Sequence, residues 1–192
     1  MTQPHLDLAA HAHDRVGEHR DDEQWLAARW SDPGTRVLVV SGSRVRPEGG
    51  RVVWAAPAEV PEGLRILLGE REGRTWFAVV VDPAEAPGEP SDWVGLRAVL
   101  PGLVAGPAGE APLVFHALGL AEWHLATRFC ARCGGPLESR SSGHELVCES
   151  CGKAQFPRTD PAVIMAVTYG EPGASDEQIL LGRQPVWPPG RF

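Results

Sequence analysis

The residues best placed for chemistry in this sequence are four cysteines, arranged as two Cys-x2-Cys pairs. The pairs are Cys130 with Cys133 and Cys148 with Cys151, and fourteen residues separate them. Two residues between cysteines allow one tight turn to aim both sulfurs at a single point. Two such turns give tetrahedral ligation by four sulfurs, which suits Zn2+. The spacing therefore predicts a zinc ribbon in which these four cysteines are the ligands.

Each cysteine pair is followed by a glycine, Gly134 after the first and Gly152 after the second. Glycine tolerates a positive φ, so backbone N–H groups can turn toward the thiolates. Four ligands leave no open position for water or substrate, which predicts one structural zinc ion per chain. Iron in a rubredoxin-like site, two disulfides, or a redox-active pair remain alternatives.

Many zinc ribbons bind nucleic acid, so the charge of this segment matters. Five basic residues stand against three acidic ones between positions 128 and 158, a difference of +2: Arg128, Arg132, Arg140, Lys153 and Arg158 against Glu138, Glu145 and Glu149. A zinc ion with four thiolates adds about −2. The segment is therefore near neutral and has no basic run, which favours a structural role over a nucleic-acid-binding one.

The composition of the 192-residue chain is that of a globular protein, with 43% hydrophobic and 22% charged residues. Its net charge of −7 repels nucleic acid and anionic membranes as a whole. No segment approaches the roughly 20 apolar residues that span a bilayer, and the N-terminus has no signal-peptide pattern. We therefore expect a cytoplasmic protein with no membrane partner.

The first half of the chain has mainly β character. Residues 1–21 are polar and rich in histidine, and we expect a mobile tail there. Within residues 22–110 we expect the following elements: a short helix over Asp21–Trp30 capped by Asp21 or Asp22, buried strands at Arg36–Ser41 and Arg51–Ala56, and a hairpin of Leu64–Gly69 with Thr75–Val81. The Pro/Gly-rich segment Pro101–Pro112 is the expected boundary of this domain.

The second half begins with a connecting helix over residues 111–128, whose apolar residues recur every three or four positions. It leads into the ribbon, residues 129–157. Because four thiolates already satisfy the metal, we expect His124 to be packed and hydrogen-bonded rather than a ligand. Two further strands are expected at Ala162–Thr168 and Gln178–Gly182. The fold class is therefore α+β.

Three segments resemble the bacterial NADH pyrophosphatases, the zinc-ribbon members of the Nudix hydrolase superfamily: AEWHLATRFCARCGGPL, CESCGKAQFPRTDPAVIMAV and QILLGRQPVWPPGRF. LLGEREGRTWFAVVV and the WVGLR of Trp93–Arg97 are similar more weakly. The resemblance implies cleavage of NAD(H) into nicotinamide mononucleotide and AMP, or removal of NAD caps from RNA. It also implies a homodimer, and a catalytic Mg2+ or Mn2+ held by carboxylates of the Nudix box.

The Nudix box itself, G-x5-E-x7-R-E-U-x-E-E-x-G-U with U aliphatic, does not occur in this sequence. The pair Arg71-Glu72 leads instead into Gly-Arg-Thr. We therefore expect the chain to be a fragment: a mainly-β N-terminal domain, the connecting helix, the ribbon, and in residues 158–192 the first β-hairpin of an incomplete Nudix α/β/α fold. Alone, such a chain is expected not to hydrolyse NADH.

Two substrate-binding residues follow from the same resemblance. Phe156, directly before Pro157, matches an aromatic residue that stacks on the nicotinamide end from the neighbouring subunit. Arg97 matches an arginine that contacts the substrate. For Phe156 the alternative is a core aromatic residue that closes the ribbon, and for Arg97 it is a solvated helix charge.

The competing functional hypothesis is a non-catalytic zinc-ribbon scaffold or a nucleic-acid-binding module. It explains the cysteines and the missing box equally well. It does not explain why an aromatic-proline pair is followed by a Nudix-like hairpin, which favours the hydrolase.

Overall fold

The structure is a computed structural model, and it describes residues 13–107, 109–158, 165–182 and 185–190. The chain forms two compact units, Met1–Pro157 and Arg158–Phe192. The first unit has three α-helices among its described residues: α2 (Glu23–Trp30), α3 (Leu96–Ala105) and α4 (Glu110–Ala126). Its strands are β1 (Arg36–Ser41), β2 (Arg44–Val45), β3 (Pro47–Glu48), β4 (Arg51–Val52), β5 (Leu64–Arg71), β6 (Arg74–Val81), β7 (Leu137–Arg140), β8 (Glu145–Cys148) and β9 (Ala154–Gln155). Short 3-10 turns are η1 (Gly17–His19), η2 (Pro57–Glu59), η3 (Pro90–Asp92) and η4 (Ser141–Gly143).

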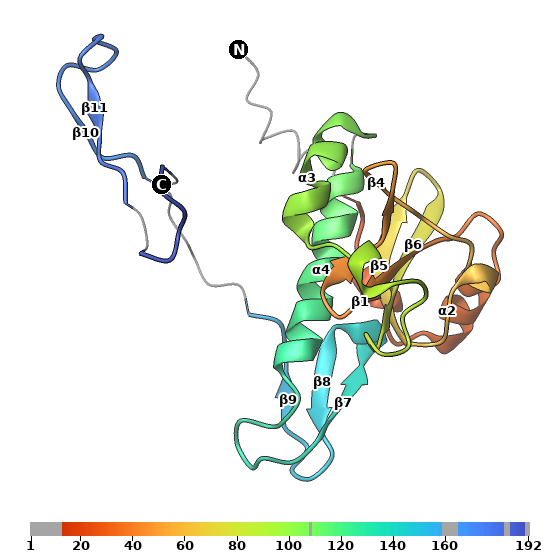
Figure 1. Ribbon diagram of the computed structural model, residues 1–192. Coiled ribbons are helices and arrows are strands. Elements are labelled where there is room, and N and C mark those ends of the chain that lie inside the picture. The colour runs from red at the N-terminus through yellow and green to blue at the C-terminus, as the bar shows by residue number, and fades with distance from the viewer. Residues whose placement is uncertain (1–12, 108, 159–164, 183–184, 191–192) are drawn as a thin grey trace. The chain divides into compact units, whose positions relative to one another are not determined.

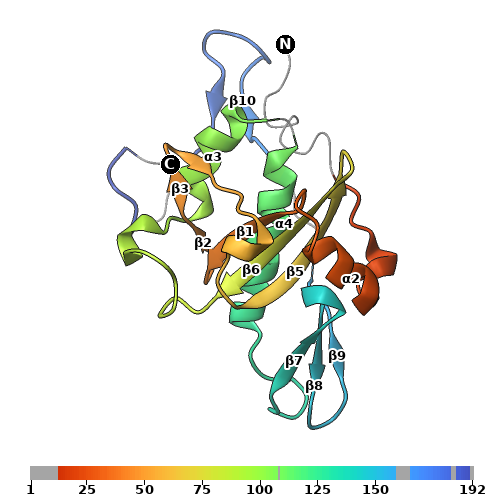
Figure 2. The same ribbon diagram turned by 90° about the vertical axis from the view of Figure 1, so that its right-hand side faces the viewer.

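The main sheet of the first unit has the strand order β2-β1-β6-β5. Strand β1 runs parallel to β6 along its whole length, while β2 and β5 pair antiparallel to their neighbours. Helix α4 covers one face of this sheet and α2 lies on the other side (Figures 1 and 2). A strand buried on both faces reads as a continuous apolar run, which explains the RVLVVS sequence of β1.

The two sheet faces have separate hydrophobic cores. The core under α3 and α4 includes Leu38, Val40, Ile66, Leu68, Ala78, Val99, Leu103, Leu113, Val114, Ala117 and Leu120. The core toward α2 includes Val16, Val37, Leu67, Phe77, Val79 and Val81, with Trp25, Leu26 and Trp30 packed against it. Alternate residues of one strand thus serve opposite cores, and both cores hold the sheet in place.

The predicted first helix and hairpin are confirmed. Helix α2 begins after Asp22, whose carboxylate accepts a hydrogen bond of 3.0 Å from the backbone N–H of Trp25. Strands β5 and β6 extend the predicted hairpin to a two-residue turn at Glu72-Gly73. Both turn residues have positive φ, 52° and 71°, as a tight type I′ hairpin turn requires.

The strand predicted at Arg51–Ala56 is shorter than expected. Only Arg51–Val52 forms a strand, because its partner β3 is itself only two residues long. Farther along, Ala55 makes one isolated antiparallel bridge to Val37 of β1. This bridge brings the intervening Trp54 to the start of the main sheet.

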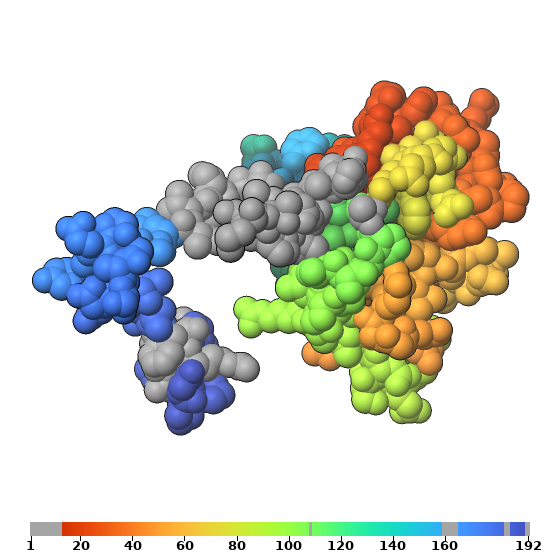
Figure 3. Space-filling view, turned by 90° about the horizontal axis from the view of Figure 1, so that it is seen from above, coloured from red at the N-terminus to blue at the C-terminus, as the bar shows by residue number. Residues whose placement is uncertain are grey.

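The segment expected to be a Pro/Gly-rich break is partly helical. Helix α3 passes through Pro101, although an interior proline removes a backbone hydrogen bond and costs about 3 kcal/mol. Burial of Val99 and Leu103 offsets this cost. Gly102 lies so close to the carbonyl oxygen of Gly50 that a Cβ would come within 2.2 Å of it. The residues expected to break the chain therefore let α3 pack closely on the β3–β4 turn, the green and orange segments that meet in Figure 3.

The expected N-terminal tail also differs from the structure. From His13 onward the chain packs on the main sheet: His13 is only 8% exposed, and Asp14 exchanges two backbone hydrogen bonds with Glu70 of β5, at 3.0 and 2.7 Å. The physical reason is that β5 would otherwise be an open sheet edge here, with unpaired backbone groups.

The ribbon is a three-stranded antiparallel sheet in the order β7-β8-β9, below the C-terminal end of α4 (Figure 1). In the second unit, β10 (Thr168–Tyr169) pairs antiparallel with β11 (Gln178–Ile179). Of the strand predicted at Ala162–Thr168, residues 162–164 lie outside the described residues, residues 165–167 are not in a strand, and only Thr168 belongs to β10. The returning strand predicted at Gln178–Gly182 is limited to Gln178–Ile179. Within the described residues, no helix combines the length and apolar character needed to cross a membrane.

Candidate functional site

The four cysteine sulfurs form one cluster in the ribbon, and all lie within 4.8 Å of one another. The Sγ atoms of Cys130 and Cys151 are 3.8 Å apart, and those of Cys133 and Cys148 are 3.5 Å apart. A tetrahedron with Zn–S bonds of roughly 2.3 Å has edges of about 3.8 Å. A disulfide needs about 2.05 Å, so the thiols are free and placed for a metal ion.

The two cysteine turns have the same backbone design. The N–H of Gly134 donates to the carbonyl of Cys130 at 2.8 Å, and the N–H of Gly152 donates to the carbonyl of Cys148 at 2.9 Å. The two glycines have φ of 73° and 68°, a conformation that residues with a Cβ rarely adopt. The geometry therefore confirms the prediction that each Cys-x2-Cys pair forms a tight turn followed by a glycine with positive φ.

The sulfurs compete for protons when no cation is present. Hydrogen bonds from the backbone N–H groups of Arg132 and Cys133 lower the pKa of Cys130 to about 6, against the opposing effect of burial. The N–H of Gly135 has the largest single effect on the pKa of Cys133 and lowers it, but the sulfurs of Cys151 and Cys148 together with burial outweigh this effect and raise the pKa to about 12. Crowded thiolates of this kind are stabilised by a divalent cation, and the donor set fits zinc. With four protein ligands, such an ion supplies folding free energy and no open coordination position.

His124 is not part of this cluster. Its Nε2–H donates to the carbonyl oxygen of Gly143 at 2.8 Å, which ties the end of α4 to the β7–β8 connection. Burial lowers the pKa of His124, so the imidazole is neutral at pH 7. The prediction of a packed, hydrogen-bonded histidine is confirmed.

A second connection between α4 and the ribbon was not predicted from the sequence. His13, His116 and His144 form a histidine chain in which Nε2 of His13 lies 3.2 Å from Nδ1 of His116, and Nε2 of His116 lies 3.1 Å from Nε2 of His144. The three residues come from the N-terminal segment, α4 and the ribbon. The sequence around each of these histidines gives no signal from which their contact could be predicted.

The hydrogen bonds determine where the protons of this histidine chain lie. Nδ1 of His144 faces the carbonyl oxygens of Ser141 and Ser142 at 3.2 and 3.1 Å, and a carbonyl only accepts, so this nitrogen carries a hydrogen. In the neutral chain His116 then donates to His144, and His13 donates to His116. The remaining nitrogen, Nδ1 of His13, is then buried and carries no hydrogen, and among the described residues it accepts no hydrogen bond.

The structure places the two expected substrate-binding residues far apart within the unit. Arg97 is an exposed residue in the first turn of α3, and Phe156 follows β9 with 61% of its surface exposed. Figures 1 and 2 show α3 and β9 at opposite ends of this unit. Phe156 therefore does not close the ribbon core, and within the described residues of the first unit Arg97 and Phe156 do not share a site.

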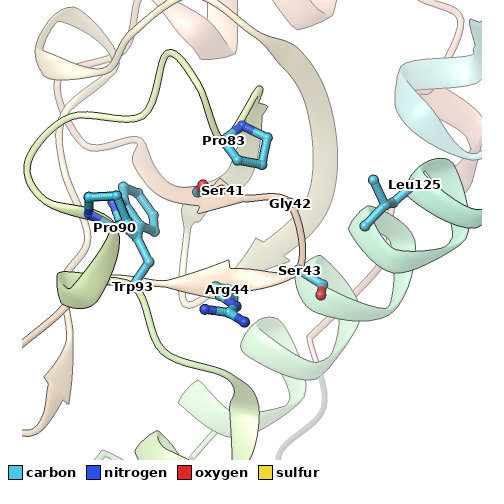
Figure 4. A pocket seen from close by; sticks show the side chains of 8 residues that line it. All are labelled: Ser41, Gly42, Ser43, Arg44, Pro83, Pro90, Trp93 and Leu125. Carbon is cyan, nitrogen blue, oxygen red and sulfur yellow. The ribbon is translucent and has the colours of Figure 1, made fainter.

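A pocket of about 380 Å³ opens at the carboxyl ends of the parallel strands β1 and β6. Figure 4 shows Ser41, Gly42 and Ser43 at its centre, Pro83 across from them, Trp93 beside Pro90, and Leu125 of α4 on the other side. Its charged lining residue is Arg44. The adjoining segment 82–92 carries Asp82, Glu85, Glu89 and Asp92, so the surroundings are not favourable for an anion.

Comparison with known proteins identifies both parts of the first unit. Residues 20–123 match the family model described as the NADH pyrophosphatase-like rudimentary NUDIX domain, and residues 126–156 match the NADH pyrophosphatase zinc ribbon domain. The first of these models covers more than half of the chain. Sequence reasoning did not identify the N-terminal domain as Nudix-like, because it carries no Nudix box.

Several curated relatives agree with this assignment. The NAD-capped RNA hydrolase NudC of Mycobacterium tuberculosis is 34% identical over 186 residues, which cover 93% of this chain and 56% of the relative. The NudC proteins of Stutzerimonas stutzeri and Chromobacterium violaceum are 32% and 28% identical, over 72% and 74% of this chain and 47% and 53% of theirs. The chain spans about half the length of these relatives. Its cysteine cluster and its two matched domains show that it belongs to the NADH pyrophosphatase family of Nudix hydrolases.

Proposed function

We propose that this chain supplies the N-terminal domain and the zinc ribbon of an NAD(H) diphosphatase. The reaction is water attack on a phosphorus of the dinucleotide pyrophosphate, which yields nicotinamide mononucleotide and AMP. NAD-capped RNA carries the same pyrophosphate and is the second substrate. The observation that carries the proposal is the succession of the two NADH pyrophosphatase domains within one compact unit.

In this proposal the ribbon acts as a rigid support for Phe156. Pro157 restricts Phe156 to an extended backbone, and the 61% exposed ring stands away from the ribbon core. An exposed flat ring suits stacking on a planar base. Because Arg97 lies at the opposite end of the unit, we propose that Phe156 serves the site of the neighbouring subunit in a homodimer.

The catalytic Mg2+ or Mn2+ belongs to the Nudix box, whose carboxylates hold the ion that stabilises charge on the diphosphate. This sequence contains no such box. We therefore propose that the 192-residue chain alone does not hydrolyse NADH. Without carboxylates to hold the ion, the main source of charge stabilisation in the transition state is missing.

The experiment compares the 192-residue chain with a chimera. The chimera joins this chain to the part of the Mycobacterium tuberculosis relative that lies beyond the matched region. Each protein is incubated with NADH and Mg2+ or Mn2+, and the products are separated by chromatography. We expect AMP and reduced nicotinamide mononucleotide from the chimera and none from the chain alone.

A folded chimera that binds zinc but releases no AMP, while the intact relative does so under the same conditions, would favour the non-catalytic scaffold. Metal-dependent AMP release by the chain alone would show a catalytic site other than the Nudix box.

A further inference from the structure

A second pocket of the first unit, of about 360 Å³, gathers cationic and aromatic side chains. Its lining includes Arg36, Arg71 and Arg74, together with Trp54 and Trp76. Most of these residues come from the starts of β1 and β6 and from the β5–β6 turn. The start of α4 closes one side, and Figure 3 shows the yellow β5–β6 turn beside this green helix start.

The charge of this arginine–tryptophan pocket is positive, although the whole chain has a net charge of −7. Three arginines stand against two carboxylates among the lining residues, a difference of +1. Glu72 pairs with Nη2 of Arg71 at 3.0 Å, whereas Glu110 accepts from the neutral indole N–H of Trp54 at 2.9 Å and keeps its charge. The lining therefore keeps its net charge of +1, and Arg36 and Arg74 pair with neither of its carboxylates.

Arg74 has the most available of these cationic groups. Among the described residues its guanidinium makes no hydrogen bond and no ion pair, and its one contact of note is with the ring of Trp76, whose centroid lies 5.9 Å away. Arg36, in contrast, donates to the carbonyls of Pro33 and Thr35. An unpaired guanidinium beside a pocket is suited to a phosphate group, which it binds through two parallel hydrogen bonds.

The two tryptophans form a fixed aromatic wall. Their rings meet edge to face, with centroids 4.7 Å apart and planes at 81°, and both residues are half-buried. The hydrogen bond to Glu110 holds Trp54 against the start of α4. A rigid indole face next to a guanidinium matches the two parts of a nucleotide, a flat base and a phosphate.

We propose that this pocket binds a nucleotide unit, either a free nucleoside 5′-monophosphate or one nucleotide of a single-stranded RNA. Arg74 holds the phosphate, and the base lies against the Trp54–Trp76 wall. The volume lies within the range of small-molecule sites in proteins. The proposal goes beyond the hydrolytic function, because the pocket lies in the N-terminal domain and contains neither the cysteine cluster nor Phe156 or Arg97.

The test measures binding to the zinc-loaded 192-residue chain in the absence of Mg2+ and Mn2+, so that hydrolysis plays no part. AMP, adenosine, inorganic phosphate and a short oligoadenylate are titrated while backbone and indole N–H signals are followed by NMR. We expect AMP to shift the signals of Trp54, Trp76 and Arg74 with a dissociation constant below about 1 mM. Adenosine and phosphate alone should bind at least about tenfold more weakly, because each lacks one of the two contacts.

Two arginine variants locate the site. Arg74→Gln should weaken AMP binding at least about tenfold, because it removes a charge-assisted contact with the phosphate. The substitution breaks no hydrogen bond among the described residues, so the fold should be retained. Arg44→Gln is the matched control, because it removes an exposed arginine from the other pocket and should leave binding unchanged. Trp54→Leu should weaken AMP and adenosine alike.

The oligoadenylate identifies the source of the nucleotide. Tighter binding of the oligomer than of AMP points to an RNA strand, and the reverse points to a free mononucleotide. Equal affinity for AMP and adenosine, an unchanged affinity in Arg74→Gln, or a loss confined to Arg44→Gln would overturn the proposal. None of these outcomes depends on whether the chimera described above hydrolyses NADH.

Discussion

The Nε2 atoms of His116 and His144 lie 3.1 Å apart, which joins helix α4 directly to the ribbon. His13 extends this contact to the N-terminal segment. If both N–H···N bonds are kept, any proton added to the histidine chain places a hydrogen on Nδ1 of His13. That atom is buried, and burial and the nearby Arg15 lower the pKa of His13, although the backbone of Leu68 acts in the opposite direction. The folded structure therefore favours the neutral form of all three rings.

The stability of the chain should fall as the pH falls from about 7 toward 4. Burial lowers the pKa of His116 to about 3 and of His144 to about 4, with Arg15 and Arg20 disfavouring the charged forms further. In the unfolded chain these histidines titrate near pH 6.5. The contribution of these two neutral histidines to the free energy of unfolding is therefore complete above pH 6.5. It is lost as the pH falls and the unfolded state takes up protons, at up to about 1.4 kcal/mol per pH unit for each histidine.

Urea denaturation at pH 7, 6 and 5 with excess zinc measures this dependence. His116→Gln keeps a donor and an acceptor but does not titrate, so its free energy of unfolding should depend less steeply on pH than that of the unchanged chain. The control is His19→Gln, which replaces a histidine outside the histidine chain and leaves the hydrogen bonds of His116 and His144 in place. Equal slopes for His116→Gln and the unchanged chain would contradict the neutral arrangement.

Removing one zinc ligand should unfold the ribbon locally. Cys148 is 1% exposed, and its sulfur lies 3.5 Å from that of Cys133. In Cys148→Ser three thiolates remain and the coordination sphere is open, so the affinity for zinc should fall sharply. Hydrogen exchange should show loss of protection in β7, β8 and β9, while β1 and β6 stay protected by their own cores. Unchanged protection of the ribbon would mean that the metal does not hold it together.

Phe156→Ala should affect substrate binding and not stability. Its ring is 61% exposed, so its truncation should leave zinc content and melting temperature nearly unchanged. In the chimera, loss of base stacking worth roughly 1–3 kcal/mol should lower kcat/KM for NADH about 5- to 150-fold, mainly through KM.

Phe77→Ala is the matched comparison for Phe156→Ala, because Phe77 is 3% exposed in the core toward α2. Its truncation should cost about 3–5 kcal/mol of stability. A normal KM in Phe156→Ala together with a large loss of stability would remove Phe156 from the substrate site.

Local patterns predicted those elements that depend on local physics. The bounds of β1 follow from a continuous apolar run, and the Asp22 cap and the cysteine turns follow from residue types at fixed spacing. Helix α3 could not be predicted, because its stability comes from contacts with β4 and the Gly50 carbonyl that outweigh Pro101. The histidine chain and the arginine–tryptophan pocket depend on segments far apart in sequence, which only the folded arrangement brings together.

The metal content of the purified chain tests most directly the claim that four thiolates hold one structural ion. Native mass spectrometry, combined with elemental analysis, measures both the number and the identity of bound metals. We expect one zinc ion per chain, with the loss of thiol protons that ligation by four cysteines requires. One iron ion per chain, or a metal-free chain whose mass shows two disulfides, would contradict the account.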